Sequence, residues 1–173
     1  MAEAARRRGW WKTALLCVVA IEVLGGLSGW LSNSGYGNGW FDALHKPSFM
    51  PAGWTFGVVW PVLYAMIGVA LAMVLAEPPS DRRKFGLTLF FIQLALNFAW
   101  SPIFFAAHDI GLGKWVIFAM AALAAAAAGQ FVRISRDGGL LLVPYLIWLV
   151  FAATLNATIE VLNPGAGTSL LGL

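Results

Sequence analysis

The sequence predicts an all-α integral membrane protein, and three observations lead to that fold class. Of the 173 residues, 60% are hydrophobic and only 11% are charged, whereas a soluble domain carries about 25% charged residues. Four long intervals contain no Asp, Glu, Lys or Arg, and a fifth is interrupted by a single acid. A membrane-spanning helix needs about 17–25 such residues. We therefore expect one membrane domain, residues 1–173, folded as a bundle of five transmembrane helices.

The basic residues predict the orientation of the bundle. If the N-terminus is cytoplasmic, the other side keeps only Lys46 and Lys114. The cytoplasmic side then holds Arg6, Arg7, Arg8, Lys12, Arg82, Arg83, Lys84, Arg133 and Arg136. This positive-inside bias predicts an inside N-terminus and an outside C-terminus, and it suits a bacterial inner membrane. It also explains the net charge of +3 better than a nucleic-acid surface does, so no nucleic-acid partner is expected.

The first helix is expected at about residues 11–31. Its basic start and apolar stretch also resemble a secretory signal peptide. Glu22 inside the apolar stretch and the lack of a clean small-x-small cleavage site favour a retained helix. Because the other spans carry no acid in mid-membrane, Glu22 is interpreted as facing the bundle or a water-filled edge rather than relaying protons.

Residues 32–53 form a long connection that is rich in Gly, Ser, Asn and Pro. It also contains Trp40, Phe41, Leu44 and Phe49, which are too apolar for a solvated linker. Long loops of compact proteins are usually functional or disordered. We expect this one to fold over the mouth of the bundle as the lid of a pocket.

The remaining helices are expected at about residues 54–76, 85–107, 114–133 and 140–162. A turn of Glu, two Pro, Ser and Asp at residues 77–81 separates the first two. A short loop follows at residues 108–113, and Ser135 to Gly139 forms the last turn. The Ala-rich run 121–129 has little side-chain bulk, which favours close packing between helices.

Common enzyme chemistry has little support in this chain. The two histidines, His45 and His108, fall in predicted loops, and the single cysteine, Cys17, falls in an apolar span. No Ser-His-Asp arrangement, paired intramembrane carboxylates or metal-ligand spacing is present in the sequence. We expect no metal site and no obligatory cofactor.

Aromatic and amide side chains instead mark three predicted helices. They share one face on each helix: Trp60 and Tyr64; Gln93, Asn97 and Trp100; Tyr145, Trp148, Ala152 and Asn156. Flat indole and phenol rings with a few amides suit a planar, mostly apolar guest. The same amides could equally serve only to hydrogen-bond across helices. Spacing alone leaves both interpretations open.

Three motifs resemble one known family. Residues 40–51 (WFDALHKPSFMP), followed by Trp54 and residues 60–64 (WPVLY), are similar to the first loop and second helix of the TspO/translocator protein family. This family is also called tryptophan-rich sensory protein or peripheral-type benzodiazepine receptor. Residues 93–105 (QLALNFAWSPIFF) resemble its third helix, and residues 143–148 with 153–156 resemble its fifth. Order and spacing agree over about residues 11–162.

The resemblance implies a five-helix bundle, often homodimeric, whose pocket is closed by the first loop. Family members bind porphyrins such as protoporphyrin IX, and some bind cholesterol and synthetic isoquinoline or benzodiazepine ligands. Carried over by motif, the pocket positions are Trp60, Asn97, Trp100, Trp148 and Ala152, with Trp40 from the loop. In bacterial relatives the pair matching Trp60 and Trp148 is implicated in light-dependent porphyrin breakdown.

The expected function is therefore a membrane receptor or sensor for tetrapyrroles, without firm catalytic residues. Two alternatives remain: light-dependent porphyrin breakdown through Trp60 and Trp148, and transport of porphyrin- or sterol-like ligands. Two departures from the family pattern bear on this. The small-xxx-small positions of the dimer face carry Thr88 and Ile92, and the tail after Asn156 lacks the Tyr-then-basic spacing proposed for cholesterol. Cholesterol is thus the less favoured ligand.

Overall fold

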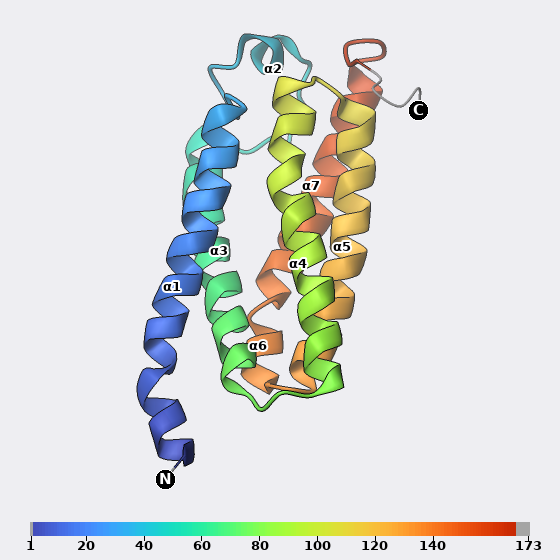
Figure 1. Cartoon of the computed structure of the whole chain (residues 1–173). Helices are drawn as coiled ribbons and strands as arrows, with labels where there is room; N and C mark the ends of the chain where they lie inside the picture. The colour runs from blue at the N-terminus through green and yellow to red at the C-terminus, as the bar shows by residue number, and fades with distance from the viewer. Residues whose placement is uncertain (1, 169–173) are drawn as a thin grey trace.

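The computed structural model describes residues 2–168, and within them all regular structure is helical. The elements in chain order are α1 (Ala2–Leu31), α2 (Gly39–Ala43), α3 (Gly53–Ala76), α4 (Asp81–Ser101), the π-helical turn η1 (Pro102–Ala106), α5 (Ile110–Val132), α6 (Arg136–Leu140) and α7 (Val143–Leu162). Figure 1 shows the long helices side by side, with α2 lying across one end of the bundle.

Five helical segments of the described chain are long and apolar enough to cross a membrane. They are residues 9–31, 53–76, 81–106, 110–132 and 136–162. The outer surface is apolar as well: Ile147 and Val150 on α7 are each 66% exposed. Water would disfavour such a surface but lipid solvates it. The predicted five-helix membrane bundle is confirmed.

Side-chain caps place two helix starts earlier than the expected positions. The Ser80 hydroxyl accepts a hydrogen bond from the Arg83 amide at 3.2 Å, so α4 begins at Asp81 rather than near residue 85. The Asp109 carboxylate accepts one from the Leu112 amide at 2.9 Å, so α5 begins at Ile110 rather than near residue 114. Ser and Asp are preferred N-caps because they satisfy otherwise unpaired amides of the first turn.

Prolines account for the irregular parts of two spans. The last span begins at Arg136 and is broken at Leu141 and Leu142, just ahead of Pro144 in the first turn of α7, because proline has no amide hydrogen to continue the helix. In the third span the backbone widens at Pro102, whose carbonyl accepts from the Ala107 amide at 2.8 Å to form η1. Such π-turns frequently accompany functional sites. Here η1 orients Phe104 and Phe105 towards the interior, where both are buried.

Close backbone contact joins α1 to α3. A Cβ atom on Gly68 would lie 2.7 Å from the Val18 Cα, so only glycine permits this distance between the two helices. Further along the bundle, Phe90 of α4 stacks on Phe131 of α5 with centroids 5.4 Å apart. Both rings are fully buried. These two rings fill the core between α4 and α5 in the part of the bundle away from α2 (Figure 1).

Candidate ligand-binding cavity

A cavity of about 340 Å³ lies inside the bundle, beneath the loop that contains α2. Small-molecule sites typically occupy about 300–1,000 Å³. Its wall comes from α1, the loop, α3, α4 with η1, α5 and α7. The lining includes Glu22, Gly25, Gly29, Tyr36, Phe41, Met50, Phe56, Trp60, Tyr64, Asn97, Trp100, Phe104, Ile117, Met120, Trp148, Phe151, Ala152, Leu155 and Asn156. Among these residues Glu22 contributes the carboxyl group, and the remainder are apolar, aromatic or neutral polar.

Aromatic rings from two different helices meet on one side of this cavity. The Trp60 ring of α3 and the Trp148 ring of α7 contact edge to face, with centroids 6.3 Å apart and planes at 84°. Phe56, one turn before Trp60, contacts Trp148 at 5.8 Å. Such pairs add about 0.5–1.5 kcal/mol beyond their buried area. The predicted convergence of indoles from separate spans is present.

A chain of buried hydrogen bonds crosses the bundle next to these rings. The Tyr64 hydroxyl donates to Asn97 Oδ1 at 2.8 Å, and Asn97 Nδ2 donates to the Tyr145 hydroxyl at 3.0 Å. Tyr145 in turn donates to Gln93 Oε1 at 2.9 Å. This chain joins α3, α4 and α7. The amide of Asn97 therefore has the bundle-holding role that its spacing left open, and the side chain also lines the cavity.

The predicted ligand-binding residues are mostly brought together. Those that line the cavity are Trp60, Tyr64, Asn97, Trp100, Trp148, Ala152 and Asn156. Two lie outside the lining. Tyr145 is fully buried in the hydrogen-bond chain, and Trp40 stacks on His108 with centroids 4.3 Å apart and contacts Phe104 edge to face at 5.5 Å.

The part of the chain that forms the cavity matches a known protein family. The model of the TspO/MBR family matches residues 15–162, which include every membrane span at least in part. The chain belongs to the TspO/MBR family. It is therefore an integral membrane protein of that family.

Relatives in this family extend from bacteria to mammals. The chain is 40% identical to the tryptophan-rich protein TspO of Chlorobaculum tepidum, over 72% of its own length and 80% of the relative. It is 38% identical to the translocator protein of Sus scrofa, over 82% of its length and 86% of the relative. It is also 35% identical to protein CrtK of Rhodobacter capsulatus, over 73% and 79% of the two chains.

Some lining residues of this TspO/MBR member were not foreseen from the sequence. Phe56 precedes Trp60 by four residues and Phe104 follows Trp100 by four, so helical spacing could have found both. Phe151 follows Trp148 by three residues, on the same face of α7. The glycines of α1 line the cavity because α1 lies directly against α3: a Cβ on Gly25 would stand 2.2 Å from the Tyr64 ring. Spacing within one helix carries no signal for that contact.

The loop of this family member is fastened to the end of α7. Asn163 accepts from the His45 amide at 2.7 Å and donates to the His45 carbonyl at 2.8 Å. The Trp40 indole donates to the Ala166 carbonyl at 3.0 Å. The ring of Phe41 packs on Phe104 and Phe105 of η1. Trp40 thus holds the loop in place, while Phe41 and Met50 face the cavity.

Within residues 2–168, three buried side-chain polar atoms have no hydrogen-bond partner. They are the indole nitrogens of Trp100 and Trp148 and the amide oxygen Oδ1 of Asn156. All three side chains line the cavity. An unpaired buried polar group is unfavourable by about 1–3 kcal/mol.

Proposed function

We propose that this chain is a membrane receptor that binds a flat tetrapyrrole, such as protoporphyrin IX, in the cavity. The observation that carries the proposal is the cavity of about 340 Å³ whose wall includes Trp60 and Trp148 from different helices. Flat aromatic walls favour a flat, apolar guest, because stacking and edge contacts add to the burial of its faces.

The polar groups of the wall support the same class of ligand. The Trp148 indole N–H is buried and has no partner among the described residues, so it would donate to an acceptor on the guest where the adjoining side chains shift to admit one. One of the two Asn97 N–H groups is used by Tyr145, which leaves the other available to a guest. A few donors in a mainly apolar wall fix the orientation of a ligand without demanding that it be charged.

The loop over the cavity provides a means of reporting occupancy. Tyr36, Phe41 and Met50 of the loop line the cavity, so a guest contacts them directly. The same loop is bonded through exposed His45 to Asn163 at the end of α7. A ligand that stabilises one arrangement of the loop would therefore change the surface presented to a partner, which is the basis of the proposed sensing.

A titration in lipid nanodiscs tests the proposal. Protoporphyrin IX is added in darkness while tryptophan fluorescence is followed, and we expect saturable quenching. Replacing Trp148 by Leu removes one aromatic contact of about 0.5–1.5 kcal/mol, so affinity falls roughly two- to thirteen-fold. Trp115→Phe is the matched control, because Trp115 is 55% exposed and lies outside the lining. An absence of saturable quenching, or equal losses in both variants, contradicts the proposal.

The contact between Trp60 and Trp148 favours a second candidate function, light-dependent porphyrin breakdown. Two oxidisable indoles 6.3 Å apart on the cavity wall could supply electrons to an excited porphyrin, with molecular oxygen as the oxidant. Repeating the titration under illumination separates the two functions. If light removes the porphyrin Soret band with the unmodified chain but not with Trp60→Phe or Trp148→Phe, breakdown is favoured. A stable Soret band in the saturated complex favours binding and sensing alone.

A further inference from the structure

Glu22 supplies the only carboxyl group in the lining of the cavity among the described residues. It stands on α1, whose end at Leu31 lies at the α2 end of the bundle (Figure 1). At a rise of about 1.5 Å per residue, Glu22 is about 13 Å below that end, within the membrane span of residues 9–31. Its carboxyl group therefore belongs to the deep part of the cavity, away from the mouth beneath the loop.

No basic side chain compensates Glu22 in the described cavity. Gly25 lies one turn later on the same face of α1, and a Cβ atom there would stand 2.8 Å from the Tyr64 hydroxyl oxygen. Tyr64 already donates its hydroxyl hydrogen to Asn97 Oδ1 at 2.8 Å. Among residues 9–168 the Glu22 carboxyl group has no ion-pair partner, and the lining contains no Lys, Arg or His. A ligand in the cavity therefore meets this acid without a neighbouring cation.

The propionates of a tetrapyrrole are the groups that this acid disfavours. Protoporphyrin IX carries both propionates on neighbouring pyrrole rings, so one edge of the macrocycle is anionic and the opposite edge is apolar. A carboxylate brought close to Glu22 is repelled, or one of the two acids must take up a proton. Both outcomes weaken binding, and the apolar wall leaves little water to screen the repulsion. The apolar edge can occupy the same place without this penalty.

The mouth of the cavity is a better place for the propionates. Ser34, Gly35 and Tyr36 of the loop line the cavity there, and Ser34 and Tyr36 are exposed. This loop lies outside the membrane-spanning segments, so water reaches it. Ionised carboxylates keep their hydration at such a position, whereas burial without a partner is strongly unfavourable. Solvation at the mouth and repulsion in the deep part thus favour the same orientation.

We propose that Glu22 sets the orientation and the selectivity of tetrapyrrole binding, with the apolar edge directed into the cavity and the carboxylate edge at the mouth. This inference rests on the proposed function, because it concerns the same ligand class in the same cavity. It narrows that class to tetrapyrroles whose carboxylates lie on one edge. Coproporphyrin I, with a propionate on every pyrrole ring, presents a carboxylate to Glu22 in each orientation and is disfavoured.

The experiment measures the quenching of tryptophan fluorescence in darkness, in lipid nanodiscs at mildly alkaline pH, with partition into empty nanodiscs subtracted. The ligands are protoporphyrin IX, its dimethyl ester and coproporphyrin I. Glu22→Gln keeps the size of the side chain and removes the acid. Like charges about 10 Å apart at an effective dielectric constant of about 20 weaken binding about ten-fold. Affinity for coproporphyrin I should therefore rise about ten-fold in Glu22→Gln, while protoporphyrin IX gains much less and the ester does not change.

Two further variants make the test specific to this position. Glu77→Gln removes an acid at the far end of α3, opposite the loop and outside the lining (Figure 1). No porphyrin should respond to this control. Ser34→Asp places an acid on an exposed residue at the mouth. It should weaken protoporphyrin IX several-fold and leave the dimethyl ester unchanged, because the ester has no ionised group for the new acid to repel.

The outcomes separate this inference from the function on which it rests. Equal gains by protoporphyrin IX and coproporphyrin I in Glu22→Gln would place the propionates beside Glu22 and overturn the orientation, as would undiminished binding of protoporphyrin IX in Ser34→Asp. No gain by coproporphyrin I, or equal responses in Glu22→Gln and Glu77→Gln, overturns the role of Glu22 even where protoporphyrin IX binds. A complete absence of saturable quenching by protoporphyrin IX and its ester contradicts the proposed function itself.

Discussion

Asn97 is the residue through which three helices exchange hydrogen bonds. Its amide accepts from Tyr64 of α3 and donates to Tyr145 of α7. Replacing Asn97 by Leu keeps the approximate volume but leaves the Tyr64 hydroxyl without this buried partner. Interhelical hydrogen bonds in membranes average about 0.6 kcal/mol each, and an unsatisfied hydroxyl adds about 1–3 kcal/mol. We expect the free energy of unfolding to fall by roughly 2–4 kcal/mol.

Unfolding in mixed micelles with increasing dodecyl sulfate measures this loss. Thr88→Val on the same helix is the control, because its hydroxyl bonds only the Lys84 carbonyl on the exposed face. An Asn97→Leu variant as stable as the Thr88→Val control would mean that the chain of hydrogen bonds contributes nothing to stability.

The periodicity of residues along each helix predicted which face a side chain occupies. It did not predict whether that side chain lines the cavity or is buried between helices. Trp148 and Tyr145 share a stripe of α7, yet Trp148 reaches the cavity and Tyr145 is fully buried one turn away. Whether a side chain reaches the cavity depends on where neighbouring helices leave space, and residue spacing within one helix does not encode this. The side chains of Trp100 and Asn156, which both come within 3.5 Å of a Cβ atom added to Gly113, are a similar case, because α4, α7 and α5 together create that contact.

At the scale of elements, the sequence contains signals for helix ends that hydropathy alone does not detect. Ser80 and Asp109 are ordinary cap residues, and reading them as such would have placed the starts of α4 and α5 correctly. The π-turn η1 differs. Pro102 indicates an irregularity, but whether the backbone kinks, breaks or widens there depends on how Phe104 and Phe105 pack.

The loop over the cavity provides the prediction at this scale. Asn163 bonds both the amide and the carbonyl of His45, so Asn163→Ala removes two contacts that hold the loop to α7. Each is worth about 0.5–1.5 kcal/mol net. Opening of the loop should become easier by a similar total, and amide hydrogen exchange over residues 38–50 should accelerate roughly ten-fold or more.

Exchange followed by mass spectrometry resolves this segment from the spans. Thr154→Val serves as the control, since the Thr154 hydroxyl bonds only within α7, to the Val150 carbonyl. Unchanged exchange at residues 38–50 in Asn163→Ala would show that the loop is held by its packing on η1 rather than by these bonds.

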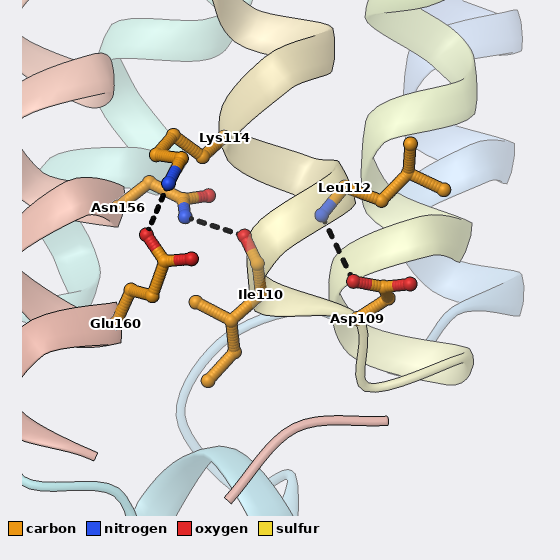
Figure 2. Close-up of polar contacts among 6 residues, drawn as sticks. All are labelled: Asp109, Ile110, Leu112, Lys114, Asn156 and Glu160. Atoms are coloured by element: carbon orange, nitrogen blue, oxygen red, sulfur yellow. Dashed lines mark hydrogen bonds and ion pairs between the residues drawn. The ribbon is translucent and has the colours of Figure 1, made fainter. Parts of the chain in front are cut away.

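At the scale of the whole molecule, basic residues gather at one end of the bundle. The start of α4, with Arg82, Arg83 and Lys84, lies at the end opposite α2, as does the end of α5 with Arg133 (Figure 1). Lys46 and Lys114 belong to the other end, and Lys114 is neutralised there by Glu160 at 2.6 Å (Figure 2). The fold thus preserves the charge asymmetry that the sequence shows, and the asymmetry predicts the orientation in the membrane.

We expect the α3–α4 turn to be cytoplasmic and the α2 loop to face outward when the chain is expressed in a bacterial inner membrane. Cys17, the single cysteine, is first replaced by Ala, and one new cysteine is then placed at exposed Ser48 or exposed Pro79. A membrane-impermeant maleimide added to spheroplasts should label Ser48→Cys at once and Pro79→Cys only after lysis. Because the two positions lie at opposite ends of one rigid bundle, the reversed pattern would mean an outside N-terminus. Equal labelling would mean that the net positive charge at the α4 end is too small to fix a single orientation.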